Sequence, residues 1–472
     1  MSKSFVYLIY FCVYSLVILF IGKSSFSESD SVPKFFIGER KTGLLRLFFT
    51  FVGTWISAAS ILGFTGNVCQ NGTAVIIVSV IPWFIGALML YAISDRLYEH
   101  NVLTIPQLIG ERYQSDFLQI GTGILICVGY ILYLVIQIKG FGIAASSLLH
   151  IDYKVSVFLV YLFILYSTFG GFLSVSKTDG CNLVMLTVSV VLIYLTVIRQ
   201  ADAGLVLSNQ VVEQKLLAAG SAEGIGYHPL GYTSLMYLTT FFGWGMGLAA
   251  NPQYLIRLVA AKDRKTAKRM LLYALAFLTF FYFCLTQIGL GISLIDPKLG
   301  AHCETDNILI HAINHLLSSR FSGFFLISII GSCISTANSQ LLLVGSIMSY
   351  DVVGKLWKKN CSEDRILFLA RWFIFLGGTA SLLLSIDPPA NVLFFGADIW
   401  GVFAAVLTPL IYGMFVSKRG TKKGACAAFL VGLVSSFLFI RMDLPVYWGF
   451  PATLCSCVAY AVIPVLEKGV RR

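Results

Sequence analysis

Residues 331–343 carry oxygen-bearing side chains inside one of the most apolar stretches of the chain. The segment reads GSCISTANSQLLL and lies between FSGFFLISII and LVGSIMSY. Polar groups in hydrocarbon need a partner, because no water is available to them there. Hard cations prefer oxygen ligands, and neutral oxygens can replace an ion's water yet still release the ion. Ser332, Ser335 and Thr336 therefore indicate a site for a small cation. The alternative is that Ser335 and Thr336 bond to carbonyls of their own helix.

Two other apolar segments are interrupted in a matching way. Residues 53–66 read GTWISAASILGFTG, and residues 241–252 read FFGWGMGLAANP and end at Pro252. Small residues in a membrane helix can serve close helix packing alone. Broken helices in corresponding positions of two halves, however, are typical of a binding site near the bilayer midplane. Their freed carbonyl groups must be satisfied by something in lipid, and an ion together with a solute can do so.

Lys139 is an unusual charge in the middle of a membrane segment. Such a residue costs about 2.5–3.5 kcal/mol on insertion scales and usually faces a cavity. One hypothesis is that its ammonium meets a carboxylate of the substrate; the alternatives are snorkelling to the surface or an ion pair with Asp398. Gln137 precedes Lys139 by two residues, so the two side chains do not share a helix face.

The segment TDNILIHAINHLL, within residues 294–320, predicts a short amphipathic surface helix that begins at Thr305 or Asp306. His311 and His315 are four residues apart, which suits a metal, but no third ligand lies nearby and no zinc site is expected. Cys69 and Cys303 both fall in loops that are predicted to lie outside the membrane. Whether they form a disulfide is left open by the sequence.

The composition shows which kind of chain must position these groups. Of 472 residues, 57% are hydrophobic and only 12% are charged, and the mean hydropathy is +0.82. Apolar runs long enough to cross a bilayer, roughly 20 residues each, recur throughout. The chain is therefore predicted to be an all-α polytopic membrane protein. Its net charge of +11 is attributed to cytoplasmic loops rather than to nucleic-acid binding.

About thirteen transmembrane helices are expected by the length rule. Their predicted ranges are 5–22, 44–66, 74–94, 117–148, 154–173, 180–198, 231–256, 270–293, 321–350, 366–386, 391–416, 424–440 and 446–465. With the N-terminus outside, 26 of the 34 lysines and arginines fall in inner loops or inner span ends. This bias predicts an outside N-terminus and a cytoplasmic C-terminus.

Several short motifs follow one another in an order that resembles the sodium/solute symporter family along nearly the full length. They are Phe35-Phe36-Ile37-Gly38-Glu39-Arg40, Thr104-Ile105-Pro106 with Glu111-Arg112-Tyr113, Gly170-Gly171-Phe172 with Thr178-Asp179, Pro252 with Arg257 and Ala260-Ala261-Lys262-Asp263, Ile334 to Leu342, and Thr421 with Gly424-Ala425. The resemblance implies a LeuT-like core of two inverted five-helix repeats. The implied division is 1–43 (first helix and inner loop), 44–198 (first repeat), 199–230 (outer loop), 231–416 (second repeat) and 417–472 (two last helices and tail).

The resemblance also implies a sodium site between the second and ninth spans. Its ligands would be the carbonyls of Gly53, Ile56 and Ser332 and the hydroxyls of Ser335 and Thr336. A second cation would lie near Asp179 and Ser339, unless Asp179 is a loop carboxylate paired with Lys177. The solute would lie against Ser57, Ser60, Trp83, Gln137, Lys139 and Trp244.

The predicted function is a sodium-coupled symporter that imports a small carboxylate or zwitterion across the plasma (bacterial inner) membrane, with a monomer sufficient. Trp244-Gly245-Met246-Gly247 resembles proline permeases, whereas Leu248 and Trp55 depart from them, and Arg112-Tyr113-Gln114-Ser115 leans toward pantothenate permeases. The alternatives are a solute sensor with a separate signalling partner and a proton-coupled symporter. No nucleophile–base pair is seen, so an enzyme is not expected.

Overall fold

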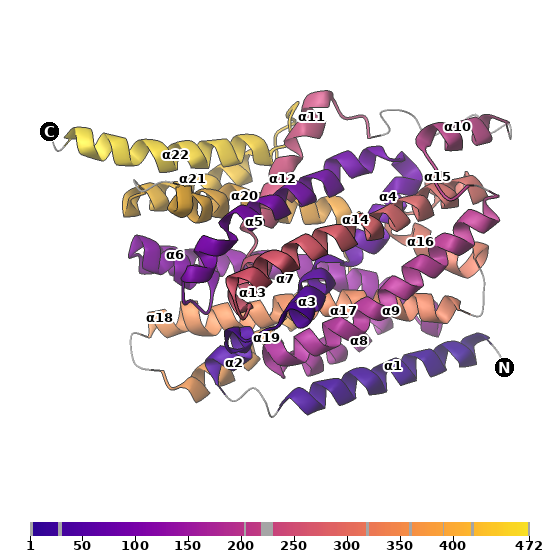
Figure 1. Cartoon of the computed structure of the whole chain (residues 1–472), viewed down its shortest axis with the longest axis horizontal. Coiled ribbons are helices and arrows are strands. Elements are labelled where there is room, and N and C mark those ends of the chain that lie inside the picture. The colour runs from indigo at the N-terminus through magenta and orange to yellow at the C-terminus, as the bar shows by residue number, and fades with distance from the viewer. Residues whose placement is uncertain are drawn as a thin grey trace.

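The computed structural model describes residues 3–26, 31–202, 204–218, 230–317, 321–357, 361–389, 391–416 and 420–470. In these ranges the regular secondary structure is helical, apart from one isolated β-bridge between Thr42 and Ala261. Helices α1 and α22 place the two chain ends at opposite ends of the long axis (Figure 1). Of the basic residues used for the orientation, Lys358, Lys359, Lys418, Arg419, Arg471 and Arg472 lie outside the described residues, as do residues 203 and 219–229 of the predicted outer loop.

The helices follow one another along the chain with short connections. The first half comprises α1 (Lys3–Phe26), α2 (Val32–Ile37), η1 (Gly38–Arg40), α3 (Leu44–Trp55), η2 (Ala59–Gly63), α4 (Phe64–Asn71), η3 (Ile76–Val80), α5 (Ile81–Glu99), α6 (Ile105–Tyr113), α7 (Asp116–Leu149), α8 (Tyr153–Thr168), α9 (Gly171–Gln200) and α10 (Asn209–Ala218). The second half comprises α11 (Ser234–Thr239), α12 (Phe241–Ala250), α13 (Pro252–Ala260), α14 (Arg264–Ile295), α15 (Leu299–His302), η4 (Thr305–Asn307), α16 (Ile308–His311), η5 (Ala312–Leu316), α17 (Ser322–Ile347), η6 (Met348–Val353), α18 (Gly354–Leu356), α19 (Glu363–Leu384), α20 (Val392–Val416), α21 (Lys422–Phe439) and α22 (Gly449–Val470).

Nine helices of the described chain are long and apolar enough to cross a membrane, and a bent pair raises the number to ten. Their surfaces carry many exposed leucines, valines and phenylalanines, as expected where lipid rather than water is the solvent. The polytopic helical prediction is therefore confirmed, while the number thirteen stays a prediction.

Helix α17 forms the centre of the bundle and is buried over almost its entire length. It packs most extensively against α7 and α9 and also contacts α3, α8 and α19. Small residues permit this close approach: a Cβ on Gly331 would meet the side chain of Asn182 at 2.9 Å. The helix that carries the oxygen-rich segment therefore has protein, not lipid, on every side.

Both predicted helix breaks are present. Helices α3 and η2–α4 together make one span bent by 59°, with Ile56 in an extended conformation between them. The second break falls at Asn251, which is also extended and which caps α13 by accepting a hydrogen bond from the backbone N–H of Gln253. Pro252 occupies the first turn of α13, where its missing N–H costs nothing.

Residues Leu299–Leu316, here called the plug, cover one end of the bundle. The predicted short helix is present, because η4, α16 and η5 follow one another without a gap over residues 305–316. It is not a surface helix, however, since Ile308, Leu309 and Ile313 are buried. The plug rests on α4, because the Thr305 hydroxyl donates to Gln70 Oε1 at 2.8 Å and Gln70 donates back to the Gly300 carbonyl at 2.9 Å. It is tertiary packing, rather than an amphipathic face turned to water, that holds this segment.

The N-cap predicted at Thr305 or Asp306 is wrong, because the helix begins at Thr305 and Glu304 is its N-cap residue. Asp306 instead lies in a buried ion pair. Lys139 donates to its carboxylate at 2.7 Å and to the Pro389 carbonyl at 3.0 Å, and both side chains of the ion pair are buried. The backbone N–H of Val392, at the start of α20, also donates to Asp306. Asp398, the partner considered from the sequence, instead accepts a hydrogen bond from Trp448 at 2.8 Å.

The opposite end of the bundle, here called the basic end, is closed by backbone pairing. Thr42 N–H donates to the Ala260 carbonyl at 3.2 Å, and Lys262 N–H donates to the Thr42 carbonyl at 3.1 Å. Arg40 inserts its guanidinium among the last carbonyls of α5, donating to those of Tyr98 and His100. The segments that precede α3 and α14 are thus joined directly by backbone hydrogen bonds.

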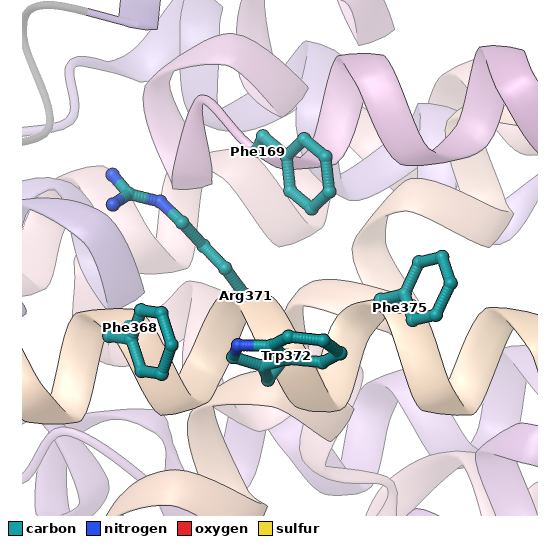
Figure 2. A pocket seen from close by; sticks show the side chains of 5 residues that line it. All are labelled: Phe169, Phe368, Arg371, Trp372 and Phe375. Carbon is teal, nitrogen blue, oxygen red and sulfur yellow. The ribbon is translucent and has the colours of Figure 1, made fainter.

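An apolar pocket of about 320 Å³ lies on the outer surface between α8 and α19 (Figure 2). Figure 2 shows Phe368, Trp372 and Phe375 along one helix, with Phe169 opposite and the Arg371 guanidinium extending away from the rings. The three α19 rings are exposed by 38–58%. Such rings suit contact with lipid, and the pocket is separate from the oxygen-rich centre.

Removing one partner of the Lys139–Asp306 pair should destabilise the protein, because the other charge would stay buried without compensation. We expect Lys139→Met and Asp306→Asn each to lower the free energy of unfolding by about 3–5 kcal/mol, measured as thermal stability in detergent. The double variant should recover most of that loss, and Lys298→Met, at an exposed lysine, serves as the control. Single variants as stable as the parent would contradict this assignment.

Gly66 is the position where α4 touches the plug, and a Cβ there would overlap the carbonyl oxygen of Thr305. Gly66→Ala should therefore displace the plug and cost about 1–3 kcal/mol, the range of overpacking substitutions. Cys69, a buried free thiol on the same helix, should then react faster with an aqueous thiol reagent. Gly43→Ala is the matched control, since no atom lies within 4 Å of its Cβ position.

Candidate functional site

The first helix break presents backbone carbonyls to α17. Ser332 donates to the Ile56 carbonyl at 2.7 Å, and the Thr336 hydroxyl lies 3.4 Å from the Thr54 carbonyl and 3.5 Å from that of Ile56. These hydroxyls therefore point across to the broken helix rather than along their own helix. The structure brings together Ile56, Ser332 and Thr336, three of the predicted sodium ligands.

The two broken helices meet at the same place. Gln253, the second residue of α13, donates from its side chain to the Thr54 carbonyl at 2.9 Å and accepts a bond from Gln340 of α17 at 3.0 Å. Tyr130 of α7 secures the second break by donating to Asn251 at 2.6 Å and accepting from the Gln253 N–H at 2.8 Å. Sequence reasoning missed Gln253 and Tyr130, although Gln253 directly follows the Pro252 signal.

Asp179 lies about two turns into α9 and is fully buried, so the loop carboxylate considered from the sequence is wrong. Its two carboxylate oxygens accept hydrogen bonds from Ser335 at 2.5 Å and from Thr50 at 2.6 Å. Gly53 permits this approach, because a Cβ there would lie 3.1 Å from the Ser335 hydroxyl and 3.3 Å from Asp179 Cβ. The structure thus places Ser335 and Gly53 beside a carboxylate, next to the Ser332–Thr336 oxygens.

Arg257, which is also fully buried, compensates this carboxylate. Its guanidinium donates to the Thr50 carbonyl at 3.1 Å and to Ser339 at 2.7 Å. A second cation at Ser339 would lie against that guanidinium, where like charges repel strongly at low dielectric. Ser339 therefore already has a cationic partner, and the second cation near Asp179 and Ser339 stays a prediction.

Aromatic rings gather on the other side of the first break. Trp244 lies between Trp83 and Trp400, with ring centroids 4.9 Å and 4.8 Å apart. Tyr282 lies beside Trp83, and Tyr133 stacks on Trp400 at 5.6 Å. Trp55 and Tyr254 complete what we call the aromatic group, which contains two predicted solute residues, Trp83 and Trp244, and five that sequence reasoning missed.

The polar solute residues lie at the edge of this group. Gln137 accepts a hydrogen bond from the Ala58 N–H at 3.1 Å, just beyond the break, and Ser60 shares one with Tyr282 at 2.9 Å. Ser57 is buried in the break itself. Lys139 is the predicted solute residue that the structure does not bring here, because its ammonium is bonded to Asp306 and Pro389.

The arrangement suits an alkali cation better than a transition metal. The central ligands are carbonyls and hydroxyls, with one carboxylate beside them, which is the donor set of a hard ion. Among the described residues no three His, Cys, Asp or Glu side chains gather as metal ligands. His311 and His315 lie on the plug with ring centroids 4.5 Å apart, and Cys69 and Cys303 are free thiols.

Several known proteins of similar sequence are transporters of bacteria. The chain is 22% identical to the osmoregulated proline transporter OpuE of Bacillus subtilis, covering 97% of this chain and 94% of the relative. It is 23% identical to the high-affinity proline transporter PutP of the same organism (94% and 95%) and 23% identical to the sodium/proline symporter of Escherichia coli (98% and 93%).

Solved structures share the fold. A sodium-coupled sialic acid symporter in a substrate-bound, outward-open state superposes with a TM-score of 0.81 over 98% of both chains at 16% identity. Mhp1, a nucleobase-cation-symport-1 family transporter, superposes with a TM-score of 0.59 over 93% of this chain and 94% of that one, at 11% identity. These likenesses confirm the predicted LeuT-like fold class.

A family match then settles what kind of protein this is. The model of the sodium:solute symporter family matches residues 35–432, which is most of the chain. The protein therefore belongs to the sodium:solute symporter family and is a sodium-coupled transporter, not an enzyme.

Proposed function

We propose that this protein imports a small organic carboxylate or zwitterion, of the proline or pantothenate kind, together with sodium. The observation that carries the proposal is the meeting of the Ile56 carbonyl with Ser332 and Thr336 at the first helix break. The relatives named proline transporters support a solute of this size and charge.

The first sodium would lie among the carbonyls of Gly53 and Ile56 and the oxygens of Ser332, Ser335 and Thr336. Gly53 lies in the last turn of α3, directly before the break at Ile56. When sodium binds, hydroxyls such as that of Ser332 would rotate so that their O–H no longer points at the Ile56 carbonyl. Their lone pairs would then face the cation. Neutral ligands of this kind bind sodium reversibly, as transport requires.

The solute would lie against the aromatic group, beside Ser57, Ser60, Gln137, Trp83 and Trp244. Lys139 is left out of the proposed solute site, because its charge is already compensated by Asp306.

A tenfold sodium gradient supplies about 1.4 kcal/mol, and 100 mV adds about 2.3 kcal/mol per charge. One ion could then sustain roughly 500-fold accumulation of a neutral solute.

Transport would proceed by alternating access between two five-helix repeats, residues 44–198 and 231–416, in the plasma membrane. The plug end would face outward, with the N-terminus outside, and the basic end would face the cytoplasm. Sodium bound at the first break would favour opening of the plug end, solute would close it, and loss of sodium inside would loosen the site.

Uptake of radiolabelled L-proline and pantothenate into proteoliposomes tests this function. An inward sodium gradient should drive uptake, and replacing external sodium with choline should abolish it. Uptake driven equally well by a proton gradient would favour the proton-coupled alternative, and sodium-independent binding without flux would favour a sensor.

Thr336→Ala and Ser332→Ala should each raise the sodium concentration for half-maximal uptake about tenfold, the equivalent of one hydrogen bond's worth of free energy. Ser346→Ala is the matched control, because this buried hydroxyl of the same helix donates to a carbonyl of its own helix, that of Leu342. If the control and the two variants behave alike, sodium does not bind between α3 and α17.

A second cation at Asp179 would give two sodium ions per solute, measured as the ratio of labelled sodium to labelled solute taken up. Asp179→Asn should reduce this ratio to one, because the amide removes a carboxylate oxygen that would bind the second ion. A ratio of one in the unmodified protein would contradict the second site and leave the first intact.

A further inference from the structure

Four side-chain polar groups near the proposed solute site are buried and have no hydrogen-bond partner. They are the indole N–H of Trp83, the indole N–H of Trp400, the side-chain NH₂ of Gln137 and the hydroxyl of Ser57. Each side chain is at most 4% exposed. Buried polar groups are nearly always paired, so four unpaired groups in one region indicate a ligand.

These groups come from three helices and from the first break itself. Trp83 belongs to α5, Gln137 to α7 and Trp400 to α20, while Ser57 lies between α3 and η2. They are linked through side chains already described, since Trp244 contacts both tryptophans and Tyr133 lies one helical turn from Gln137. The oxygen of Gln137 is already taken by the Ala58 N–H, which leaves its NH₂ as the free half of the amide.

Three of the four groups can only donate, and the hydroxyl can do so as well. Two acceptors nearby are already used: Ser60 is paired with Tyr282, and the Thr54 carbonyl with Gln253. A solute that pairs with these four groups must therefore present hydrogen-bond acceptors, such as oxygens, and few donors. A carboxylate does this best, because hydrogen bonds to an ionised acceptor are about twice as strong as neutral ones.

No side chain of the aromatic group carries a positive charge, and both nearby cations are engaged elsewhere. Arg257 is bonded to Thr50 and Ser339, and Lys139 to Asp306. We infer that the solute's carboxylate is recognised by uncharged donors, chiefly the indole N–H groups of Trp400 and Trp83, and not by Lys139. This inference rests on the proposed function and names Trp400 as a specificity-determining residue of the same site.

Trp400→Phe and Trp83→Phe test the inference, because each keeps the aromatic ring and removes only the donor. Sodium-driven uptake of L-proline and pantothenate would be measured, with pyrrolidine as a competitor that lacks a carboxylate. We expect each variant to raise the half-saturating concentration of the transported carboxylate about tenfold or more and to leave inhibition by pyrrolidine unchanged. Trp372→Phe, at an exposed ring of α19, is the matched control.

The double variant Lys139→Met with Asp306→Asn removes both charges of the buried pair and should leave the half-saturating concentration within twofold. Unchanged values for Trp400→Phe and Trp83→Phe, or a tenfold rise for the double variant, would overturn the inference. Stronger sodium-driven uptake of a solute without a carboxylate would overturn it too, while leaving sodium coupling intact. Absence of sodium-driven uptake across the whole panel would instead contradict the proposed function.

Discussion

The backbone carbonyls released where α3 ends are the constraint on which the centre of the molecule depends. In lipid an unsatisfied carbonyl costs several kcal/mol, so a helix can break there only if other groups replace its hydrogen bonds. The replacements come from three helices: Ser332 and Thr336 of α17 and Gln253 of α13 reach the carbonyls, while Gln137 of α7 reaches the N–H of Ala58. The hydroxyl groups among them can turn to an ion without any change of backbone.

The same requirement explains the buried charges. Asp179 and Arg257 both lie inside the bundle and share Thr50 as a common partner, so neither is left uncompensated. At the plug end the charges of Lys139 and Asp306 compensate each other. Their contacts join α7, η4 and the start of α20. Charge in this protein therefore connects segments far apart in the sequence, and the solute region is lined by neutral groups.

Local sequence patterns predicted the helices, both breaks and the Ser332–Thr336 cluster, because apolar length, glycine, proline and hydroxyl residues are local signals. The partner of Lys139 could not be predicted, since Asp306 lies 167 residues away and was assigned to a surface helix. Trp400 and Tyr254 were missed for a similar reason: an aromatic residue in an apolar helix has no signal of its own until the neighbouring rings are known. Tyr130 and Tyr133 could have been found, because with Gln137 they occupy positions i, i+3 and i+7 of one face of α7.

That face of α7 contacts both helix breaks. Tyr130 is hydrogen-bonded to the second break and Gln137 to the first. Seven residues of α-helix measure about 10 Å, and a helix does not stretch. α7 therefore acts as a rigid spacer that fixes the separation of the ion-binding carbonyls from the Asn251 turn. A one-residue insertion between these two positions would rotate one contact by about 100° relative to the other and disturb both breaks together.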